Sequence, residues 1–292
     1  MPTVSVIIPV FNGACYLREA LDSVFFQTYH DYEIICVDDG STDGSPAILG
    51  EYGERVTIIR QTNAGQGAAR NAGARLAVGV YVAFLDQDDR WYPHKLERQV
   101  AAMRANHDAV LVHCNSDRMD EAGNLLQVGA TLAEYPKALE SPLGRLIGDG
   151  LILPSAMLVR RDVLENVGGF DPNLSGFEDF DLSVKLRMKG RFVFLEESGM
   201  CRRVHSDGFS RSGGQVVVRS RERFLLRMKG LYAGDRSKQT LISAMLAECY
   251  SDWGMHEARA GNRKEGLRML LRSLRHNPRK FRTYSRLLRS CL

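Results

Sequence analysis

The sequence predicts an α/β fold, with a mostly parallel sheet flanked by helices and a helical C-terminal extension. Three observations support this prediction. Short apolar runs typical of buried strands alternate with helical patterns through the first third of the chain, which is the order found in parallel sheets. Acidic residues follow two of these runs directly, where such sheets bind ligands. From about residue 214 the pattern is helical almost throughout, and 292 residues suffice for one large domain and a smaller appendage.

The first half of the chain supplies the alternating elements. Its predicted strands are 4–10, 32–37, 56–59 and 80–85, and its predicted helices are 17–25, a segment starting at Ser45-Pro46, and 66–78. Each strand is a short apolar run bounded by turn residues, whereas the helices place apolar residues three or four positions apart. The alternation therefore predicts helices on both faces of the sheet.

The second half of the chain is less regular. Its predicted elements are a helix over 93–105, a strand at 110–114, a loop-rich insertion over 116–150 with a hairpin near 123–124, a strand at 155–159 and a helix starting at Glu178. The double glycine at 213–214 marks a domain boundary, and residues 239–275 have the apolar spacing of a helix pair. We therefore expect an α/β domain over 1–213 and a basic helical extension over 214–292.

Charge divides the chain in two. The net charge is +4, but residues 220–292 hold 17 Lys and Arg against 6 Asp and Glu, which leaves residues 1–219 acidic. A basic helical tail suits an anionic membrane surface or an acidic partner. In the alternative, the leucines of the segment 263–292 pack inward and the tail caps the core of the domain.

Composition indicates a cytoplasmic protein. No stretch approaches the ~18 consecutive apolar residues of a membrane span, and the first ten residues lack the layout of a signal peptide. Six cysteines are scattered without CxxC pairs, which fits a reducing compartment. We expect a cytoplasmic location, with the inner face of the membrane as the surface that the basic helices would contact, and no nucleic-acid partner.

The most informative segment is the run FLDQDDRW at residues 84–91. Because side chains alternate along a strand, Asp86 and Asp88 can point the same way. Two carboxylates at a strand end can hold a hard divalent cation and leave coordination sites open for the phosphates of a nucleotide. The first strand is not followed by G-x-G-x-x-G, and the chain has no G-x-x-x-x-G-K. Neither a Rossmann site nor a P-loop is therefore indicated.

Four motifs occur in order along the first hundred residues: SVIIPVFN at 5–12, VDDGSTD at 37–43, NAGQGAARN at 63–71 and LDQDD at 85–89. Together they resemble the family 2 glycosyltransferases, which have the GT-A fold, and Glu178-Asp179 extends the resemblance to about residue 205. Each motif alone is a weak signal, but their shared order is specific. The Gln-x-x-Arg-Trp string of processive members occurs at 87–91, where it overlaps the acidic motif. We interpret that match as coincidence and expect a non-processive enzyme.

The resemblance implies a nucleotide-sugar site in about residues 1–115. Asp39 resembles the carboxylate that contacts the nucleotide base, with the shaping of a turn as the structural alternative. Asp88 resembles the ligand of Mn²⁺ or Mg²⁺, Asp86 would reach the ribose or the metal, and His205 would close over the diphosphate or the metal. Arg70 would pair with the diphosphate or brace an aspartate. The other donor-side residues implied are Pro9, Phe11, Asn12 and Gln87.

The resemblance also implies the catalytic residue. Asp179 would be the general base that removes the proton of the acceptor hydroxyl, with Glu178 beside it on the acceptor side. A helix N-terminus favours carboxylates in any case, which is the structural alternative, but the same field would keep Asp179 ionised. Acceptor contacts are expected in about residues 116–213, where Arg202 and Arg203 would help with phosphates or lie on the surface.

The reaction implied is metal-dependent, inverting transfer of one sugar from a nucleotide-sugar, with UDP favoured, to a saccharide or lipid-linked saccharide. Surface glycan or glycolipid assembly is the expected setting. Two alternatives stay open. A sugar nucleotidyltransferase shares a similar sheet, but its glycine-and-basic loop after the first strand is replaced here by Phe11-Asn12-Gly13. A catalytically silent nucleotide-binding or adaptor module is disfavoured by the intact Asp88 and Asp179.

Overall fold

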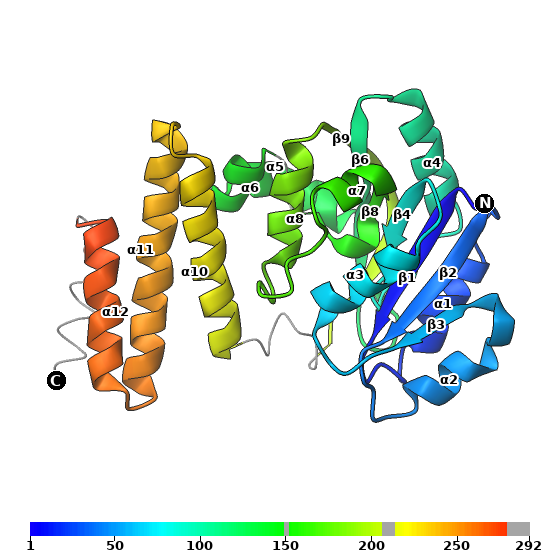
Figure 1. Cartoon of the computed structure of the whole chain (residues 1–292), viewed down its shortest axis with the longest axis horizontal. Coiled ribbons are helices and arrows are strands. Elements are labelled where there is room, and N and C mark those ends of the chain that lie inside the picture. Colours follow the sequence, from blue (N-terminus) through cyan, green and yellow to red (C-terminus); the bar gives the residue numbers. More distant parts are fainter. Residues whose placement is uncertain (149–151, 206–213, 279–292) are drawn as a thin grey trace. The chain divides into compact units, whose positions relative to one another are not determined.

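Residues 1–148, 152–205 and 214–278 are described by the computed structural model. The chain separates into two compact units, Met1–Arg211 and Ser212–Leu292 (Figure 1). The boundary expected between 213 and 214 borders on residues outside the described ranges, and it stays a prediction.

One sheet organises the first unit. Its strand order is β3-β2-β1-β4-β8-β6-β9-β5, with β7 paired to β6. The strands are β1 (Val4–Val10), β2 (Tyr32–Asp38), β3 (Thr57–Arg60), β4 (Tyr81–Phe84), β5 (Arg90–Trp91), β6 (Ala109–Met119), β7 (Leu125–Gln127), β8 (Met157–Arg160) and β9 (Arg191–Arg203). The β1, β2, β3 and β4 ladders are parallel. Beyond β4 the ladders are antiparallel except that of β6 with β9, so the predicted parallel strands form one half of a mixed sheet.

Helices cover both faces of the sheet, which confirms the α/β prediction. They are α1 (Leu17–Phe25), α2 (Ser45–Glu51), α3 (Gln66–Leu76), α4 (Lys95–Ala105), α5 (Ala130–Glu140), α6 (Pro142–Ile147), α7 (Arg161–Asn166) and α8 (Glu178–Arg187), with 3-10 turns η1 (Gly53–Arg55) and η2 (Pro154–Ala156). One buried core joins β1 to α1, α2 and α4, and a second joins it to α3, α7 and α8. Side chains of β1 alternate between the two cores, with Ile8 in the first and Ile7 in the second.

The second half of the unit departs from the prediction in two places. The segment over 116–150, expected to be loop-rich, contains the end of β6 and the helices α5 and α6. The hairpin near 123–124 is present between β6 and β7. Strand β9 was not predicted, because charged and exposed positions interrupt its apolar pattern; its long parallel ladder with β6 holds it in the sheet. Near its C-terminal end, Cys201 pairs with Arg90 of β5, which brings β9 next to the acidic segment, residues 86–89.

The second unit is helical in its described part. It comprises α10 (Gly214–Leu231), α11 (Arg236–Arg259) and α12 (Arg263–His276), which run side by side in Figure 1. The predicted helix pair over 239–275 is therefore confirmed. Glycines allow α11 to approach α12 closely, since a Cβ on Gly254 would lie 2.8 Å from the Gly266 carbonyl oxygen and 2.7 Å from Cγ of Leu270.

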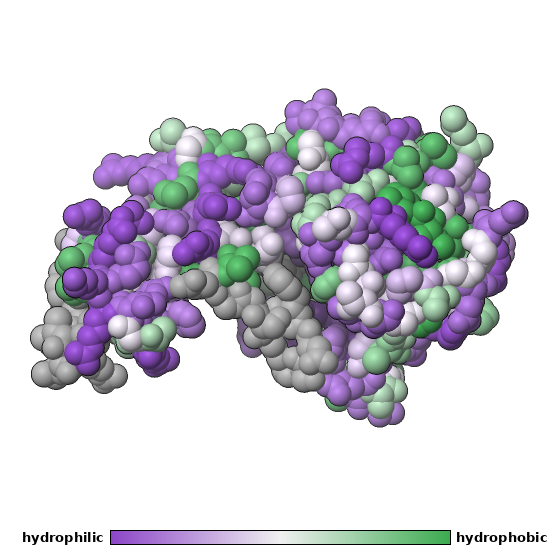
Figure 2. All heavy atoms as spheres, turned by 60° about the horizontal axis from the view of Figure 1, so that its bottom comes forward, coloured by the Kyte–Doolittle hydropathy of each residue, from purple (hydrophilic) through white to green (hydrophobic). Residues whose placement is uncertain are grey.

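The surface of the protein is mostly hydrophilic on the face seen in the space-filling view (Figure 2). On the face drawn in Figure 2, hydrophilic residues predominate and apolar ones form separate patches. Exposed large apolar side chains include Leu267 and Leu271 of α12. Among the described residues, no helix is both long enough and apolar enough to span a membrane.

Substitution Gly254→Ala is expected to destabilise the helical unit by about 1–3 kcal/mol, because the added methyl must displace the Gly266 backbone or the Leu270 side chain. Urea unfolding followed by circular dichroism measures this free energy. The matched control is Gly230→Ala in α10, where an added Cβ meets nothing within 4 Å. There we expect a gain of roughly 0.5–1 kcal/mol from helix propensity. Equal destabilisation by both variants would contradict the close approach of the two helices.

Candidate functional site

The carboxyl ends of β1, β2 and β4 meet at one edge of the sheet because these strands are parallel neighbours. The loops that follow them are bound to one another. The Gln87 amide donates to the Phe11 carbonyl at 2.9 Å and accepts from the Phe11 N–H at 2.8 Å. Asn12, with a left-handed φ of 49°, accepts from the Thr42 N–H at 2.8 Å, while Pro9 is buried in β1. The expected donor-side residues thus share one rim, although the Gln87 amide is already engaged by the backbone.

Asp39 is buried at the end of β2, where it organises the loop before α3. Its carboxylate accepts from the Gln61 side-chain amide at 2.7 Å and from the backbone N–H groups of Ala64 and Gly65 at 2.9 and 2.8 Å. Gly65 has a φ of 88°, which a side chain would strain. These contacts give Asp39 a clear structural role, and its contact with a nucleotide base stays a prediction.

Arg70 lies at the centre of the site. Its side chain is only 1% exposed, and Nη2 lies 2.6 Å from Asp86 Oδ1. Nη1 lies 3.5 Å from Asp179 Oδ1 and 3.9 Å from Glu178 Oε1. The guanidinium also lies over the Phe170 ring, 5.2 Å from its centroid. Because a buried cation must be paired to be tolerated, this cluster fixes Asp86 of the acidic motif and the first residues of α8 around one charge.

Asp179 is the member of this cluster best suited to accept a proton. Burial raises its pKa to about 7; the charge of Arg70 opposes the rise, and the charges of Glu178 and Asp86 add to it. Its Oδ1 is buried toward Arg70, whereas the side chain as a whole is 33% exposed. The carboxylate is therefore held on one side and open on the other. A base whose pKa lies near 7 can accept a proton efficiently at neutral pH.

Asp88 and His205 form a second pair, with Nε2 of the imidazole 2.9 Å from Oδ2 of the carboxylate. The Tyr16 ring packs against His205 with centroids 5.3 Å apart. Within the described ranges, no group of three or more His, Cys, Asp or Glu could hold a metal ion. The donors present instead fit a cation that takes its remaining ligands from substrate phosphates and water, as Mg²⁺ commonly does. Metal ligation by Asp88, Asp86 and His205 stays a prediction.

Asp89 ties this acidic segment to the rest of the sheet. Its carboxylate accepts from Ser155 Oγ at 2.6 Å and from the Arg203 backbone N–H at 3.1 Å. Ser155 Oγ in turn accepts from the Asp86 N–H at 3.0 Å. Burial, together with the charges of Asp88 and Asp86, raises the pKa of Asp89 well above its ordinary value. Asp89 is therefore an anchor within the protein.

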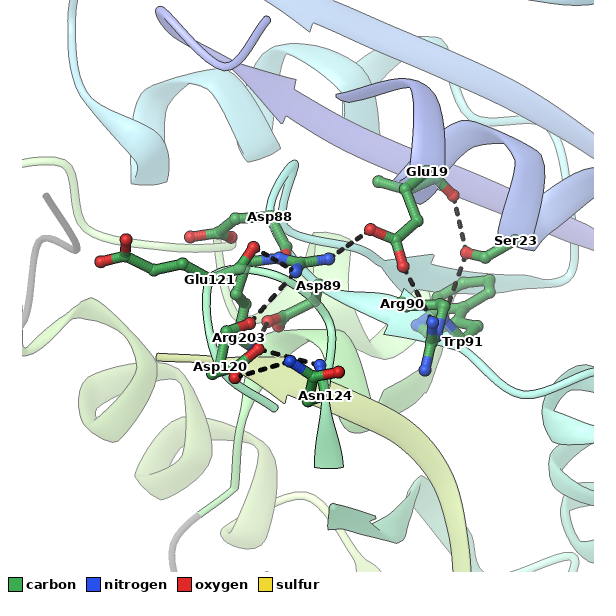
Figure 3. A network of polar contacts seen from close by, with 11 residues as sticks. Glu19, Ser23, Asp88, Asp89, Arg90, Trp91, Asp120, Glu121, Asn124 and Arg203 are labelled. Carbon is green, nitrogen blue, oxygen red and sulfur yellow. Dashed lines mark hydrogen bonds and ion pairs between the residues drawn. The ribbon is translucent and has the colours of Figure 1, made fainter. Parts of the chain in front are cut away.

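Arg203 is the residue whose position in the structure differs most from what the sequence predicted. Its side chain is only 1% exposed, so the surface alternative is wrong. Figure 3 shows it among backbone and acidic partners: it donates to the carbonyls of Asp88, Asp120 and Glu121 at 3.0, 3.2 and 3.0 Å and pairs with the Glu19 carboxylate of α1. Its partners come from three separate parts of the chain, so no local sequence signal could have identified it. Arg203 joins α1, the acidic segment and the β6–β7 hairpin.

Known proteins share both sequence and fold with this chain. Residues 5–168 match the family model described as Glycosyl transferase family 2. An uncharacterized glycosyltransferase of Rickettsia prowazekii, RP339, is 34% identical over 207 residues, which are 70% of this chain and 65% of that protein. The chain thus spans slightly less than two thirds of that relative's length.

Solved structures agree at lower identity. TarS residues 1–349 of S. aureus, in complex with UDP-GlcNAc, matches with a TM-score of 0.72 at 20% identity and covers 94% of this chain and 81% of that one. The mannosyltransferase PcManGT of Pyrobaculum calidifontis, in complex with GDP-Man and Mn²⁺, gives a TM-score of 0.59 at 22% identity over 80% of this chain and 65% of that one. The GT-A fold expected from the motifs is confirmed. The chain belongs to glycosyl transferase family 2.

Proposed function

We propose that this protein transfers a single sugar from a nucleotide-sugar to an acceptor hydroxyl, with inversion at the anomeric carbon. The observation that carries the proposal is the carboxylate of Asp179, whose pKa is raised to about 7 and which is held by Arg70 in one cluster with Asp86. That cluster joins a proton acceptor to the acidic motif expected to face the donor. Family membership supports sugar transfer over nucleotidyl transfer or a silent adaptor role.

For the donor we propose a UDP-sugar. A carboxylate offers about four acceptor positions, and Asp39 uses three of them within the protein. The remaining one suits the ring N–H of uracil. TarS was solved with UDP-GlcNAc, whereas PcManGT was solved with GDP-Man, so a guanosine nucleotide is the competing outcome of a donor screen.

Each residue of the proposed mechanism has a separate task. Asp179 accepts the proton of the acceptor hydroxyl as its oxygen attacks the anomeric carbon from the side opposite the leaving group. Arg70 holds Asp179 and Asp86 in place, which fixes the base relative to the donor. Asp88 and His205 would hold Mn²⁺ or Mg²⁺, whose Lewis acidity supplies stabilisation of the negative charge on the departing diphosphate.

We further propose that the acceptor is a saccharide or a lipid-linked saccharide, and that the protein binds it in the cytoplasm at the inner face of the membrane. Helix α12 supports the membrane contact. Leu267 and Leu271 are 38% and 48% exposed, and Lys264, Arg268 and Arg272 lie around the same shallow depression. Exposed leucines among cations fit a helix that lies on anionic lipid.

Asp179→Asn is expected to lower sugar transfer by about 10²–10⁴-fold, because the amide cannot accept the hydroxyl proton. Donor binding should survive, since the expected donor contacts come from the ends of β1, β2 and β4. Transfer is measured with UDP-glucose, UDP-galactose, UDP-GlcNAc and GDP-mannose against a panel of mono- and disaccharides. Donor binding is measured in the same preparations as a thermal shift in the presence of Mn²⁺.

The matched control is Asp162→Asn, an exposed aspartate paired with Arg160, which should leave both readouts unchanged. Chelation of the metal should remove the donor-induced thermal shift. Unchanged turnover in the Asp179→Asn protein would exclude that residue as the base. Absence of a thermal shift with every nucleotide-sugar would contradict the proposed activity as a whole.

The membrane contact predicts co-sedimentation with phosphatidylglycerol vesicles and little with phosphatidylcholine vesicles. Replacement of both Leu267 and Leu271 by serine should weaken binding roughly tenfold or more, because two apolar side chains no longer enter the lipid. Leu226→Ser is the control, since Leu226 is 46% exposed on α10. Binding that ignores lipid charge, or that falls equally in the control, would contradict a contact through α12.

A further inference from the structure

A cavity of about 320 Å³ lies in the half of the first unit expected to face the acceptor. It is bounded by the end of β6, by α5 and by β9, and its polar lining includes Ser116, Arg118, Thr131, Tyr135, Lys137 and Arg202. Small-molecule sites typically have volumes of roughly 300–1,000 Å³. The cavity is therefore large enough for a sugar ring.

Two connections join this cavity to the proposed reaction centre. Leu153 lines the cavity and immediately precedes η2, whose Ser155 hydroxyl binds the Asp86 N–H. Burial raises the pKa of Asp179, and the charge of Arg202 is among those that oppose the rise. Arg202 thus lines the cavity and lies within electrostatic reach of the base. The cavity is thus lined by one residue that precedes the turn bound to Asp86 and by one whose charge acts on Asp179.

The lining has an excess of positive charge. Arg118, Lys137 and Arg202 contribute three cations, and Glu134 contributes one carboxylate. Arg118 and Glu134 pair with each other at 2.8 Å, so they nearly cancel. Lys137 is exposed and therefore supplies positive charge that an entering ligand meets, and that charge favours an anionic group.

The same cavity has features that suit a saccharide. Tyr135 is stacked on Phe194, with centroids 4.7 Å apart and planes 4° apart, which holds its ring as a fixed apolar wall. The hydroxyls of Ser116 and Thr131 lie 2.6 Å apart and can both donate and accept hydrogen bonds. An aromatic wall beside hydroxyls fits the apolar face and the polar edge of a sugar ring.

We propose that this cavity binds the acceptor, and that the acceptor is an acidic saccharide whose phosphate or carboxylate lies against Lys137. The inference rests on the proposed sugar transfer and names its acceptor class. The hydroxyl that attacks the donor would belong to the same saccharide, at the end directed toward Asp179.

The test is calorimetric titration of the full chain, without donor, by glucose 6-phosphate, glucuronate and glucose. Both acidic sugars should bind, with glucose roughly tenfold weaker because it lacks the charge-assisted contacts. The tighter of the two acidic sugars identifies phosphate or carboxylate as the recognised group. Lys137→Ala should weaken the acidic sugars about tenfold. Arg104→Ala should not, because Arg104 is an exposed cation that lines a separate cavity.

Equal affinity for glucose, no binding of either acidic sugar, or equal losses in the two variants would overturn the proposal. The donor-induced thermal shift with Mn²⁺, measured on the same preparations, separates the two levels of the account. A retained shift with failed sugar binding contradicts the acidic acceptor alone. Loss of both contradicts sugar transfer as well.

Discussion

The buried charge of Arg70 is the constraint on which the rest of the site depends. A guanidinium removed from water costs several kcal/mol unless carboxylates surround it, and here the partners come from two distant elements, Asp86 after β4 and the Glu178-Asp179 pair that begins α8. Asn71, next along α3, binds the Phe170 backbone at 2.7 and 2.9 Å and brings the turn before α8 to the same place. The ion cluster therefore joins the donor and acceptor halves and positions the base at once.

The acidic segment shows how three neighbouring carboxylates can coexist. The repulsion between their like charges is reduced in a different way for each carboxylate. Asp86 is paired with Arg70, Asp88 is paired with His205, and Asp89 is buried with a raised pKa that favours its neutral form. Arg203, at the end of β9, donates a hydrogen bond to the Asp88 carbonyl and so ties the acidic segment to β9. The Asp88 carboxylate, which is expected to hold a cation, thereby belongs to a segment that is fixed at several points.

Local signals in the sequence predicted the parallel half of the sheet, the helices on both faces and the helix pair near the C-terminus. They could do so because apolar periodicity reports which face of an element is buried. Strand β9 lacked such a pattern, since its stability comes from pairing with β6. The acceptor-side helices α5 and α6 were missed for a different reason: α5 contains Pro136 and buries only Ala130, and α6 has only 6 residues.

For the candidate site, sequence patterns could predict which residues lie together but not which partners their side chains bind. The predicted parallel strands indicated that Asp39, Asp86 and Asp88 lie at one edge of the sheet, and the family resemblance added Asp179 to the expected site. The partners of each side chain could not be read from spacing. Gln87 engages the Phe11 backbone and Asp39 engages the loop before α3, which depends on loop conformations that only the folded chain defines.

If Arg70 and its carboxylates set the protonation state of Asp179, a titration of aspartate side-chain carbons by ¹³C NMR will detect it, with Asp179→Asn used for assignment. The folded wild-type protein should give a pKa of about 7 for Asp179. Arg70→Met removes the charge that opposes the rise, so the pKa should increase further by roughly 1–3 units, whereas Arg70→Lys should stay near the wild-type value. An ordinary aspartate pKa in the wild type, or equal values in all three folded proteins, would contradict the account.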